Sequence, residues 1–212
     1  MIIEYIPTFK YFSSFVKILP SQNILDFGSN CGNFLKSGTV NPKQYTGVDI
    51  DAEAIDEGKK LYPDANWIWY NRYNPVYNAA GDQSYPALHT TFDLVVSYSV
   101  FSHIAADDAI DLLGFLYDKL NDNGKILFSY CNVDNKQCVE WFRNRRIDCD
   151  DIPNDDIVYL IDNRVSKEIP KECSHFVTFY KTSWLLDKLS RFNPVSSPPL
   201  QGWVQDSMIL SK

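Results

Sequence analysis

Long apolar runs, paired cysteines and metal-binding patterns are missing from this sequence, and each absence argues against a class of protein. No apolar run approaches the roughly 20 residues that cross a bilayer. The start, MIIEYIPTFKYF, carries Glu4 early and lacks the basic start followed by a pure apolar stretch that a signal peptide has. The five cysteines form no CxxC pair, and the three histidines have no HExxH spacing. We therefore expect a cytoplasmic protein without membrane segment, disulfide framework or metal site.

Positive charge is also scarce. The chain has 20 Lys and Arg against 27 Asp and Glu, a formal net charge of −7 and a pI near 4.9. Its one basic cluster, Arg143, Arg145 and Arg146, is followed at once by three aspartates within 148–151 and is interpreted as a solvated helix face. Because proteins that grip phosphate backbones usually present a basic surface, nucleic acid is an unlikely partner. The sequence carries no signature of a particular oligomeric state.

Short β-rich runs alternate with helical stretches along 212 residues, which is one domain's worth of chain. This alternation predicts a single α/β domain with a mostly parallel sheet. The strands are expected at 23–27, 44–49, 67–70, 92–98, 125–130 and 203–210. The helices are expected over 4–19, within an N-terminal segment 1–20, and then over 32–37, 52–61, 106–120 and from about 182 onward.

Two polar segments interrupt this alternation. About twenty residues, 71–91, connect the third and fourth strands, and a connection of that length is often functional. The segment 132–174 is rich in Asp and Asn, with an expected helix at 136–147 and an expected strand at 157–161. Because it is too small to hold a core of its own, we interpret 132–174 as an insertion over the sheet.

The most informative segment is the end of the first strand, where Asp26 precedes a tight turn on Gly28 and Gly32 that opens a helix. Glycines allow close approach of a ligand and positive φ, and free N–H groups at a helix N-terminus suit a carboxylate or phosphate. The second strand ends in Asp49, whose carboxylate can accept hydrogen bonds from both hydroxyls of a ribose. Together these features predict an adenosine-containing cofactor at the carboxyl edge of the sheet.

The residues around this turn favour one cofactor over another. A nicotinamide-binding turn has the pattern GxGxxG, whereas this turn lacks the second glycine and has its last glycine one residue early. The carboxylate of Asp26 would repel a pyrophosphate but can hold the ammonium of an amino-acid moiety. A Tyr-x-x-x-Lys pair is also absent. S-adenosylmethionine is therefore favoured, and a nicotinamide-dependent oxidoreductase is the less favoured alternative.

Several segments resemble the class I S-adenosylmethionine-dependent methyltransferases. They are the glycine-rich first motif at 25–32, the second-strand motif at 45–51, the fourth strand and its turn at 92–104, and the fifth and last strands at 123–128 and 205–210. The resemblance implies a Rossmann-like methyltransferase fold, which is a doubly wound, mostly parallel seven-stranded sheet with an antiparallel last strand. It also implies S-adenosylmethionine as cofactor. We expect the insertion 132–174 to cover the acceptor site.

The resemblance also assigns residues to the cofactor. The residues expected to bind it are Asp26, Gly28, Ser29, Asn30, Gly32, Asp49, Ile50, Asn71, Tyr98 and Ser99. Asp26 and Gly28 would contact the amino-acid part, Asp49 the ribose and Ile50 the adenine. Asn71, Arg72 or Tyr73 would lie near the adenine, and Tyr98 and Ser99 would face the sulfonium and the acceptor.

One residue departs from the family pattern, because Asn30 replaces the usual middle glycine of the first motif. Asparagine is the next most tolerant residue for left-handed backbone. We therefore expect the turn to form, with weaker affinity for the cofactor.

The expected reaction is in-line displacement at the sulfonium methyl, with a small polar acceptor such as a sugar or metabolite hydroxyl. A hydroxyl acceptor needs a base, and His103 is the first candidate and His175 the second. A neutral amine would need no base. The structural alternatives are that His103 caps the next helix and that His175 is a solvated loop residue. A non-catalytic domain that binds S-adenosylmethionine or regulates a partner is the alternative function.

Overall fold

The computed structural model describes residues 16–146, 152–162, 164–171, 173–197 and 204–212. Most of the helix expected over 4–19 lies outside the described residues, and residues 16–19 are not helical.

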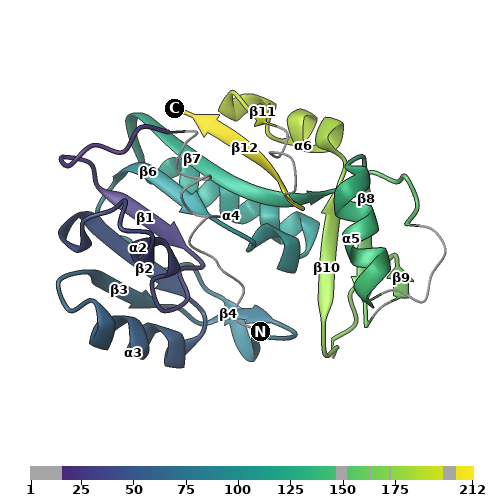
Figure 1. Ribbon diagram of the computed structural model, residues 1–212, viewed down its shortest axis with the longest axis horizontal. Coiled ribbons are helices and arrows are strands. Elements are labelled where there is room, and N and C mark those ends of the chain that lie inside the picture. Colours follow the sequence, from purple (N-terminus) through teal and green to yellow (C-terminus); the bar gives the residue numbers. More distant parts are fainter. Residues whose placement is uncertain (1–15, 147–151, 163, 172, 198–203) are drawn as a thin grey trace.

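A central sheet carries the fold (Figure 1). Seven of its strands are hydrogen-bonded neighbours in the following order: β3 (Asn66–Trp69), β2 (Tyr45–Asp49), β1 (Ile24–Phe27), β6 (Phe92–Ser97), β7 (Leu120–Asn132), β12 (Asp206–Ser211) and β11 (Val195–Ser197). The five from β3 to β7 are parallel, and β12 runs antiparallel between β7 and β11. The predicted doubly wound sheet with an antiparallel last strand is confirmed.

Three further strands extend the sheet beyond the expected seven. They are β8 (Ile157–Ile161), β9 (Arg164–Ser166) and β10 (Phe176–Tyr180). The end of β10 pairs in parallel with the end of β7, β8 pairs antiparallel with β10, and β9 pairs antiparallel with β8. The segment 132–174 therefore adds strands to the edge of the sheet beside β10, whereas the sequence indicated only the strand at 157–161.

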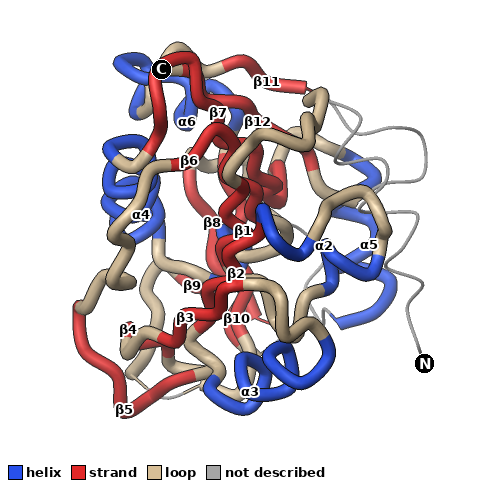
Figure 2. The backbone as a smooth tube through the Cα atoms, turned by 90° about the vertical axis from the view of Figure 1, so that its left-hand side faces the viewer, coloured by secondary structure: helices blue, strands red, loops and turns tan. Residues whose placement is uncertain are grey.

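Helices cover both faces of the sheet. They are α2 (Asn33–Lys36), α3 (Ala52–Leu61), α4 (Ala106–Asp118), α5 (Lys136–Arg146) and α6 (Thr182–Lys188), with short 3-10 turns η1 (Pro42–Gln44), η2 (Phe101–His103) and η3 (Ser190–Phe192). Figure 2 shows α4 and α6 on one side of the strands and α2, α3 and α5 on the other. None of the helices in the described part of the chain is long and apolar enough to cross a bilayer.

Alternate residues of β1 supply the cores on the two faces. Leu25 and Phe27 are fully buried in the cluster that includes α4 and α6, whereas Ile24 is buried with Phe34 of α2 on the other face. Because successive side chains of a strand point to opposite faces, a continuous apolar run is the sequence expected of a strand covered on both sides.

The long polar connection 71–91, for which the sequence analysis named no strand, has secondary structure of its own. It contains a hairpin of β4 (Arg72–Asn74) and β5 (Asn78–Gln83). The turn of the hairpin is closed by Asn74, whose Oδ1 accepts hydrogen bonds from the backbone N–H groups of Val76 and Tyr77 at 3.0 and 3.1 Å. Side chains of this kind stabilise turns without an apolar pattern, so the polar composition concealed the hairpin.

The hairpin is attached to α4 by charged groups. The guanidinium of Arg72, which is 5% exposed, lies 2.8 Å from Asp108 Oδ1 and 3.0 Å from Asp111 Oδ2. The hydroxyl of Tyr85 also donates to Asp111, at 2.6 Å. Because a buried guanidinium needs charged partners, these aspartates hold the hairpin against the start of α4.

Trp67 of β3 packs against glycines from three different elements. A Cβ atom added at Gly32, Gly47 or Gly58 would come within 2.9, 2.6 and 2.6 Å of atoms of the Trp67 ring. These glycines belong to the turn after β1, to β2 and to α3. The glycine in the second-strand motif is thus explained by the space that the indole requires.

We predict that Gly58→Ala destabilises the protein, although Gly→Ala inside a helix ordinarily stabilises by about 1 kcal/mol. The added methyl group would overlap the Trp67 ring, and such overpacking costs about 1–3 kcal/mol. Urea unfolding measures the difference. The matched control is Gly114→Ala in α4, where the nearest atom to an added Cβ is Arg191 Nη2 at 3.5 Å. This control should be neutral or stabilising, and equal effects of the two variants would contradict the packing argument.

Candidate active site

A cavity of about 580 Å³ opens at the carboxyl ends of β1, β2 and β6. Its walls come from the turn after β1, the end of β2, the β4–β5 hairpin, the turn after β6, the start of α4 and residues 169–171. A volume of this order is typical of a site for a small molecule or cofactor. Its position at the switch of strand order agrees with the rule for ligand sites in open α/β sheets.

The turn after β1 is left-handed at alternate residues. The φ angles are 80° at Gly28, 48° at Asn30 and 92° at Gly32. Asn30 therefore takes the left-handed conformation that the sequence analysis expected of it. Gly28 is further constrained, because a Cβ there would lie 2.1 Å from Val100 Cγ2. The turn after β6 packs directly on the turn after β1.

The backbone N–H groups of this turn are all used within the protein. Those of Gly28 and Ser29 donate to the carbonyl of Val48, and those of residues 32 and 33 donate to Ser29. The N–H of Asn30 donates to Asp49 Oδ2 at 2.7 Å, and that of Cys31 donates to the side chain of Asn30. The N–H groups of residues 28–33 are therefore not free for an anion, and in this respect the turn differs from a phosphate-binding loop.

Asp26 and Asp49 both face this cavity. Asp26 is 3% exposed and accepts a hydrogen bond of 2.6 Å from the Tyr45 hydroxyl. Burial raises the pKa of Asp26 to about 7; the Tyr45 hydrogen bond lowers this pKa and the charge of Asp49 raises it. The Asp49 oxygens accept from the N–H groups of Asn30 and Asp51, and burial raises the pKa of Asp49 as well. The buried Asp26 and the partly buried Asp49 on one cavity favour a ligand with a positive charge and hydroxyl donors.

The structure brings most of the predicted cofactor residues together and leaves two outside. Those that line the cavity are Asp26, Gly28, Ser29, Asn30, Asp49, Ile50, Tyr98 and Ser99. Gly32 is not part of the lining and packs against Trp67. Asn71 is not part of the lining either, because its Oδ1 accepts from Asn78 within the hairpin. Arg72 and Tyr73, the alternatives to Asn71, do line the cavity.

The two predicted catalytic histidines are neighbours. Their ring centroids are 5.9 Å apart, and His103 lines the cavity whereas His175 does not. His103 Nδ1 lies 3.0 Å from the carbonyl oxygen of Phe176. Because a carbonyl only accepts, Nδ1 carries the proton, and Nε2 is the basic nitrogen of the neutral ring. The alternative in which His103 caps α4 is wrong, since the N-cap of α4 is Ala105 and no side chain caps it.

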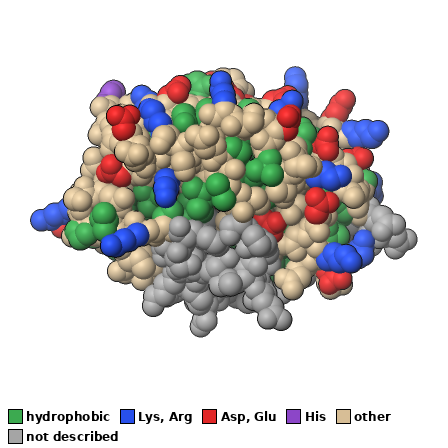
Figure 3. Space-filling view, turned by 90° about the horizontal axis from the view of Figure 1, so that it is seen from above, with side chains coloured by type: hydrophobic (Ala, Val, Ile, Leu, Met, Phe, Trp, Pro, Cys, Tyr) green, Lys and Arg blue, Asp and Glu red, His purple; other side chains and the backbone are tan. Residues whose placement is uncertain are grey.

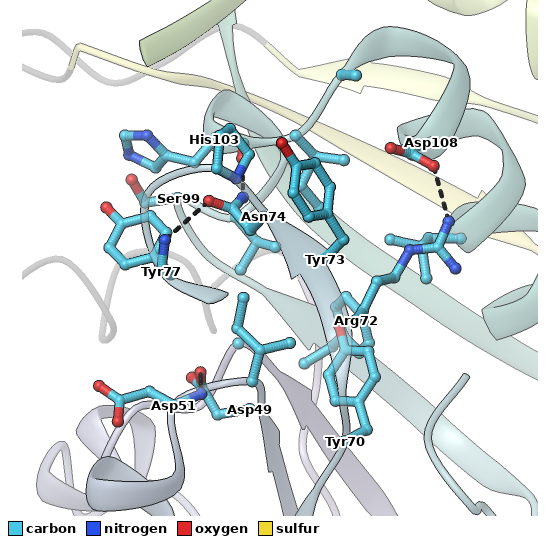
Figure 4. Close-up of a pocket in the computed structure, with 18 of the residues that line it drawn as sticks. Asp49, Asp51, Tyr70, Arg72, Tyr73, Asn74, Tyr77, Ser99, His103 and Asp108 are labelled. Atoms are coloured by element: carbon cyan, nitrogen blue, oxygen red, sulfur yellow. Dashed lines mark hydrogen bonds and ion pairs between the residues drawn. The ribbon is translucent and has the colours of Figure 1, made fainter. Parts of the chain in front are cut away.

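Labelled residues in Figure 4 lie at two ends of the cavity. Asp49 lies at one end, and His103, Asn74 and Tyr77 lie at the other. Asn74 Nδ2 donates to the His103 carbonyl at 2.8 Å, and the Tyr77 ring packs edge-on to His103. The hairpin therefore positions the residue that the sequence marked as a base.

The sequence analysis missed several residues of the cavity wall. Asp108 and residues 169–171 line it, as does Phe176 from β10. The Tyr73 hydroxyl donates to the Lys171 carbonyl at 3.0 Å, which joins the hairpin to the segment before β10. Asp108 and Asp111, spaced for one face of α4, were a signal for the Arg72 ion pairs. Residues 169–171 belong to the insertion that was expected to cover the acceptor site, although no motif marked them individually.

Comparison with known proteins identifies the family. Residues 6–164 match a family model described as a methyltransferase domain. The chain belongs to the methyltransferase family. A comparison with curated protein sequences gave no match.

Solved structures of other methyltransferases share the fold. The glycopeptide N-methyltransferase MtfA complexed with S-adenosylmethionine aligns with a TM-score of 0.61 and 14% identity, over 100% of this chain and 94% of that one. A methyltransferase from Clostridium acetobutylicum gives 0.59 and 13%, over 89% and 82% of the two chains. Magnesium protoporphyrin IX methyltransferase from Synechocystis gives 0.55 and 10%, over 97% and 76%.

We predict that Asp26→Asn makes this methyltransferase more stable than wild type at pH 8 and not at pH 4. The folded-state pKa of Asp26, about 7, lies above the usual value near 4. The wild-type contribution to stability is therefore fully present below pH 4 and falls as the pH rises to about 7. Because asparagine does not titrate, the stability difference should grow by about 2–4 kcal/mol over that range.

Urea unfolding at pH 4, 6 and 8 measures this difference. The matched control is Asp56→Asn on α3, an exposed acid whose pKa is lowered by the hydrogen bond and charge of Lys59. The Asp56 variant should show no such growth. If the difference in unfolding free energy between wild type and Asp26→Asn is the same at all three pH values, the buried-acid assignment is contradicted.

Proposed function

We propose that this methyltransferase uses S-adenosylmethionine and methylates a hydroxyl of a small polar acceptor. The observation that carries the proposal is the buried acid Asp26 beside the partly buried acid Asp49, on one cavity next to a turn whose N–H groups are all used. Related structures were crystallised with S-adenosylmethionine, S-adenosylhomocysteine and sinefungin, which supports the same cofactor class here.

Asp26 is suited to the ammonium of the amino-acid part. An ammonium beside a buried carboxylate favours its charged form, so binding would remove the cost of ionising Asp26 in an apolar site. The Asp49 carboxylate already accepts hydrogen bonds from two backbone N–H groups and has further lone pairs. These lone pairs would accept hydrogen bonds from the ribose hydroxyls. Ile50 would pack on the adenine.

A nicotinamide dinucleotide fits the cavity poorly. A pyrophosphate needs donors near the first turn, and these N–H groups already donate to Val48, Ser29, Asn30 and Asp49. The carboxyl groups of Asp26 and Asp49 on this cavity would also disfavour its negative charge. The oxidoreductase alternative is disfavoured for these reasons.

His103 is the proposed base. The bound cofactor supplies an activated methyl group, so the protein mainly positions the acceptor and removes its proton. The acceptor hydroxyl would give its proton to His103 Nε2 as its oxygen bonds the methyl carbon and the carbon–sulfur bond breaks toward sulfur. Phe176 orients the imidazole through its carbonyl, and Asn74 holds the backbone at His103.

The walls of the acceptor site would come from the hairpin and from the insertion. The hairpin contributes Tyr73, Asn74 and Tyr77, and the insertion contributes residues 169–171. All of them line the cavity, and the Tyr73–Lys171 hydrogen bond connects the two walls. Aromatic rings beside amide groups suit stacking on and hydrogen bonding to a sugar or similar metabolite. We infer that the insertion 132–174 covers the acceptor through this contact.

Asp49→Ala should weaken binding of S-adenosylhomocysteine by about 10- to 100-fold, because a carboxylate hydrogen-bonded to hydroxyls contributes about 1.5–3 kcal/mol. Isothermal titration calorimetry measures the affinity, with Asp56→Ala as the control, because this exposed acid of α3 is not part of the lining. NADH should give no binding heat. Wild-type affinity in the Asp49 variant, or tight NADH binding, would refute the cofactor assignment.

His103→Gln should lower kcat for methyl transfer by about 10²–10⁴, the usual contribution of a general base. Transfer of a labelled methyl group from S-adenosylmethionine to a panel of sugars and hydroxylated metabolites provides the assay. The control His175→Gln, which alters the neighbouring ring outside the lining, should change kcat less than tenfold. The larger loss in the His175 variant would reverse the assignment, and an absence of transfer to every acceptor would favour a non-catalytic domain.

A further inference from the structure

A closed ring of hydrogen bonds lies behind the turn after β6. Ser99 lines the cavity with a left-handed φ of 60°. Its N–H donates to Ser129 Oγ at 2.8 Å, the Ser129 hydroxyl donates to Gln205 Oε1 at 2.6 Å, and Gln205 Nε2 donates to Ser99 Oγ at 3.0 Å. The ring begins and ends at Ser99 and joins the turn after β6 to β7 and to the residue before β12.

The chemistry of the three side chains gives this ring a single direction. Ser129 is 1% exposed; its oxygen accepts from the N–H of Ser99, and its one proton goes to the amide oxygen of Gln205. The amide NH₂ of Gln205 then faces Ser99 and can only donate. Ser99 Oγ is therefore an acceptor within the ring, and its own proton is directed elsewhere.

Within the described residues, the alternative partner for that proton is Ser102 Oγ at 3.5 Å, the limit of a hydrogen bond. The Ser102 hydroxyl itself donates to the Ser99 carbonyl at 3.2 Å. A ligand oxygen in the cavity could approach Ser99 more closely than this, so the ring prepares Ser99 as a hydrogen-bond donor to a bound molecule.

Ser99 lies beside the region assigned to the amino-acid part of the cofactor. Asp26 pairs with Val96 across β1 and β6, and Val100 packs on Gly28. An amino acid carries its carboxylate on the same carbon as its ammonium, so an ammonium at Asp26 brings a carboxylate to this edge. That carboxylate meets two acids and a turn whose N–H groups are used.

We propose that the Ser99 hydroxyl donates to this carboxylate and that Gln205 is the positioning residue that directs it. The inference rests on the proposed function. Gln205 does not line the cavity, so it acts through Ser99 and not by touching the cofactor. Ser129 completes the arrangement by fixing which end of the Gln205 amide faces Ser99.

The test compares two ligands by titration calorimetry. S-adenosylhomocysteine carries the amino-acid part, and 5′-methylthioadenosine lacks it. Ser99→Ala and Gln205→Glu should each weaken the binding of S-adenosylhomocysteine by about 10- to 100-fold, the range for a hydrogen bond to a charged group. Both variants should bind 5′-methylthioadenosine with an affinity within about twofold of wild type, because the contacts of this ligand lie at the Asp49 end of the cavity. Ser99→Gly, which tolerates positive φ, replaces the alanine variant if that variant does not fold.

The double variant Ser99→Ala with Gln205→Glu separates positioning from added charge. A glutamate at 205 can only accept, so it would turn the Ser99 proton away from the ligand. If Gln205 acts through Ser99, the double variant should bind S-adenosylhomocysteine as well as Ser99→Ala alone. The control Gln137→Glu adds the same charge on the exposed surface of α5 and should bind as wild type.

Three results would overturn this assignment. They are unchanged affinity for S-adenosylhomocysteine in Ser99→Ala, equal losses for both ligands, and a further loss when Gln205→Glu is added to Ser99→Ala. A wild-type protein that binds neither ligand would instead refute the proposed function, so the two failures are distinguishable.

Discussion

The burial of Asp26 at the end of β1 is the constraint on which the site depends. The carboxyl group is 3% exposed, with Tyr45 as its hydrogen-bond donor and the acid Asp49 nearby. A buried carboxylate without a cation is costly, and the pKa of about 7 expresses that cost. The turn that follows uses its N–H groups on Val48, Asp49 and its own residues. The edge is thus poor for phosphate and suited to a cationic amino-acid group.

The remaining architecture supports the two ends of the cavity. Trp67 packs on three glycines and fixes the β1 turn, β2 and α3 relative to one another. The hairpin, attached to α4 through Arg72, brings Asn74 and Tyr77 to His103. On the face shown in Figure 3, Lys and Arg side chains are interspersed with Asp and Glu.

The sequence predicted the parts of the fold that local patterns encode. The parallel strands were found because buried strands are continuous apolar runs, and the helix expected over 52–61 coincides with α3. The hairpin was missed because side-chain hydrogen bonds of Asn74 close it. The pairing of β10 with β7 and the contact of His103 with His175 join residues far apart in the chain. Periodicity carries no information on such contacts.

Carbon-13 NMR of the Asp26 carboxyl group tests the central claim most directly. Its resonance can be assigned by comparison with the Asp26→Asn variant and titrated with and without S-adenosylhomocysteine. Without ligand the carboxyl should titrate with a pKa of about 7. With ligand the pKa should fall well below that value, because an ammonium favours the ionised form. A pKa that stays near 7 in the complex would show that the ammonium lies elsewhere and would contradict the account.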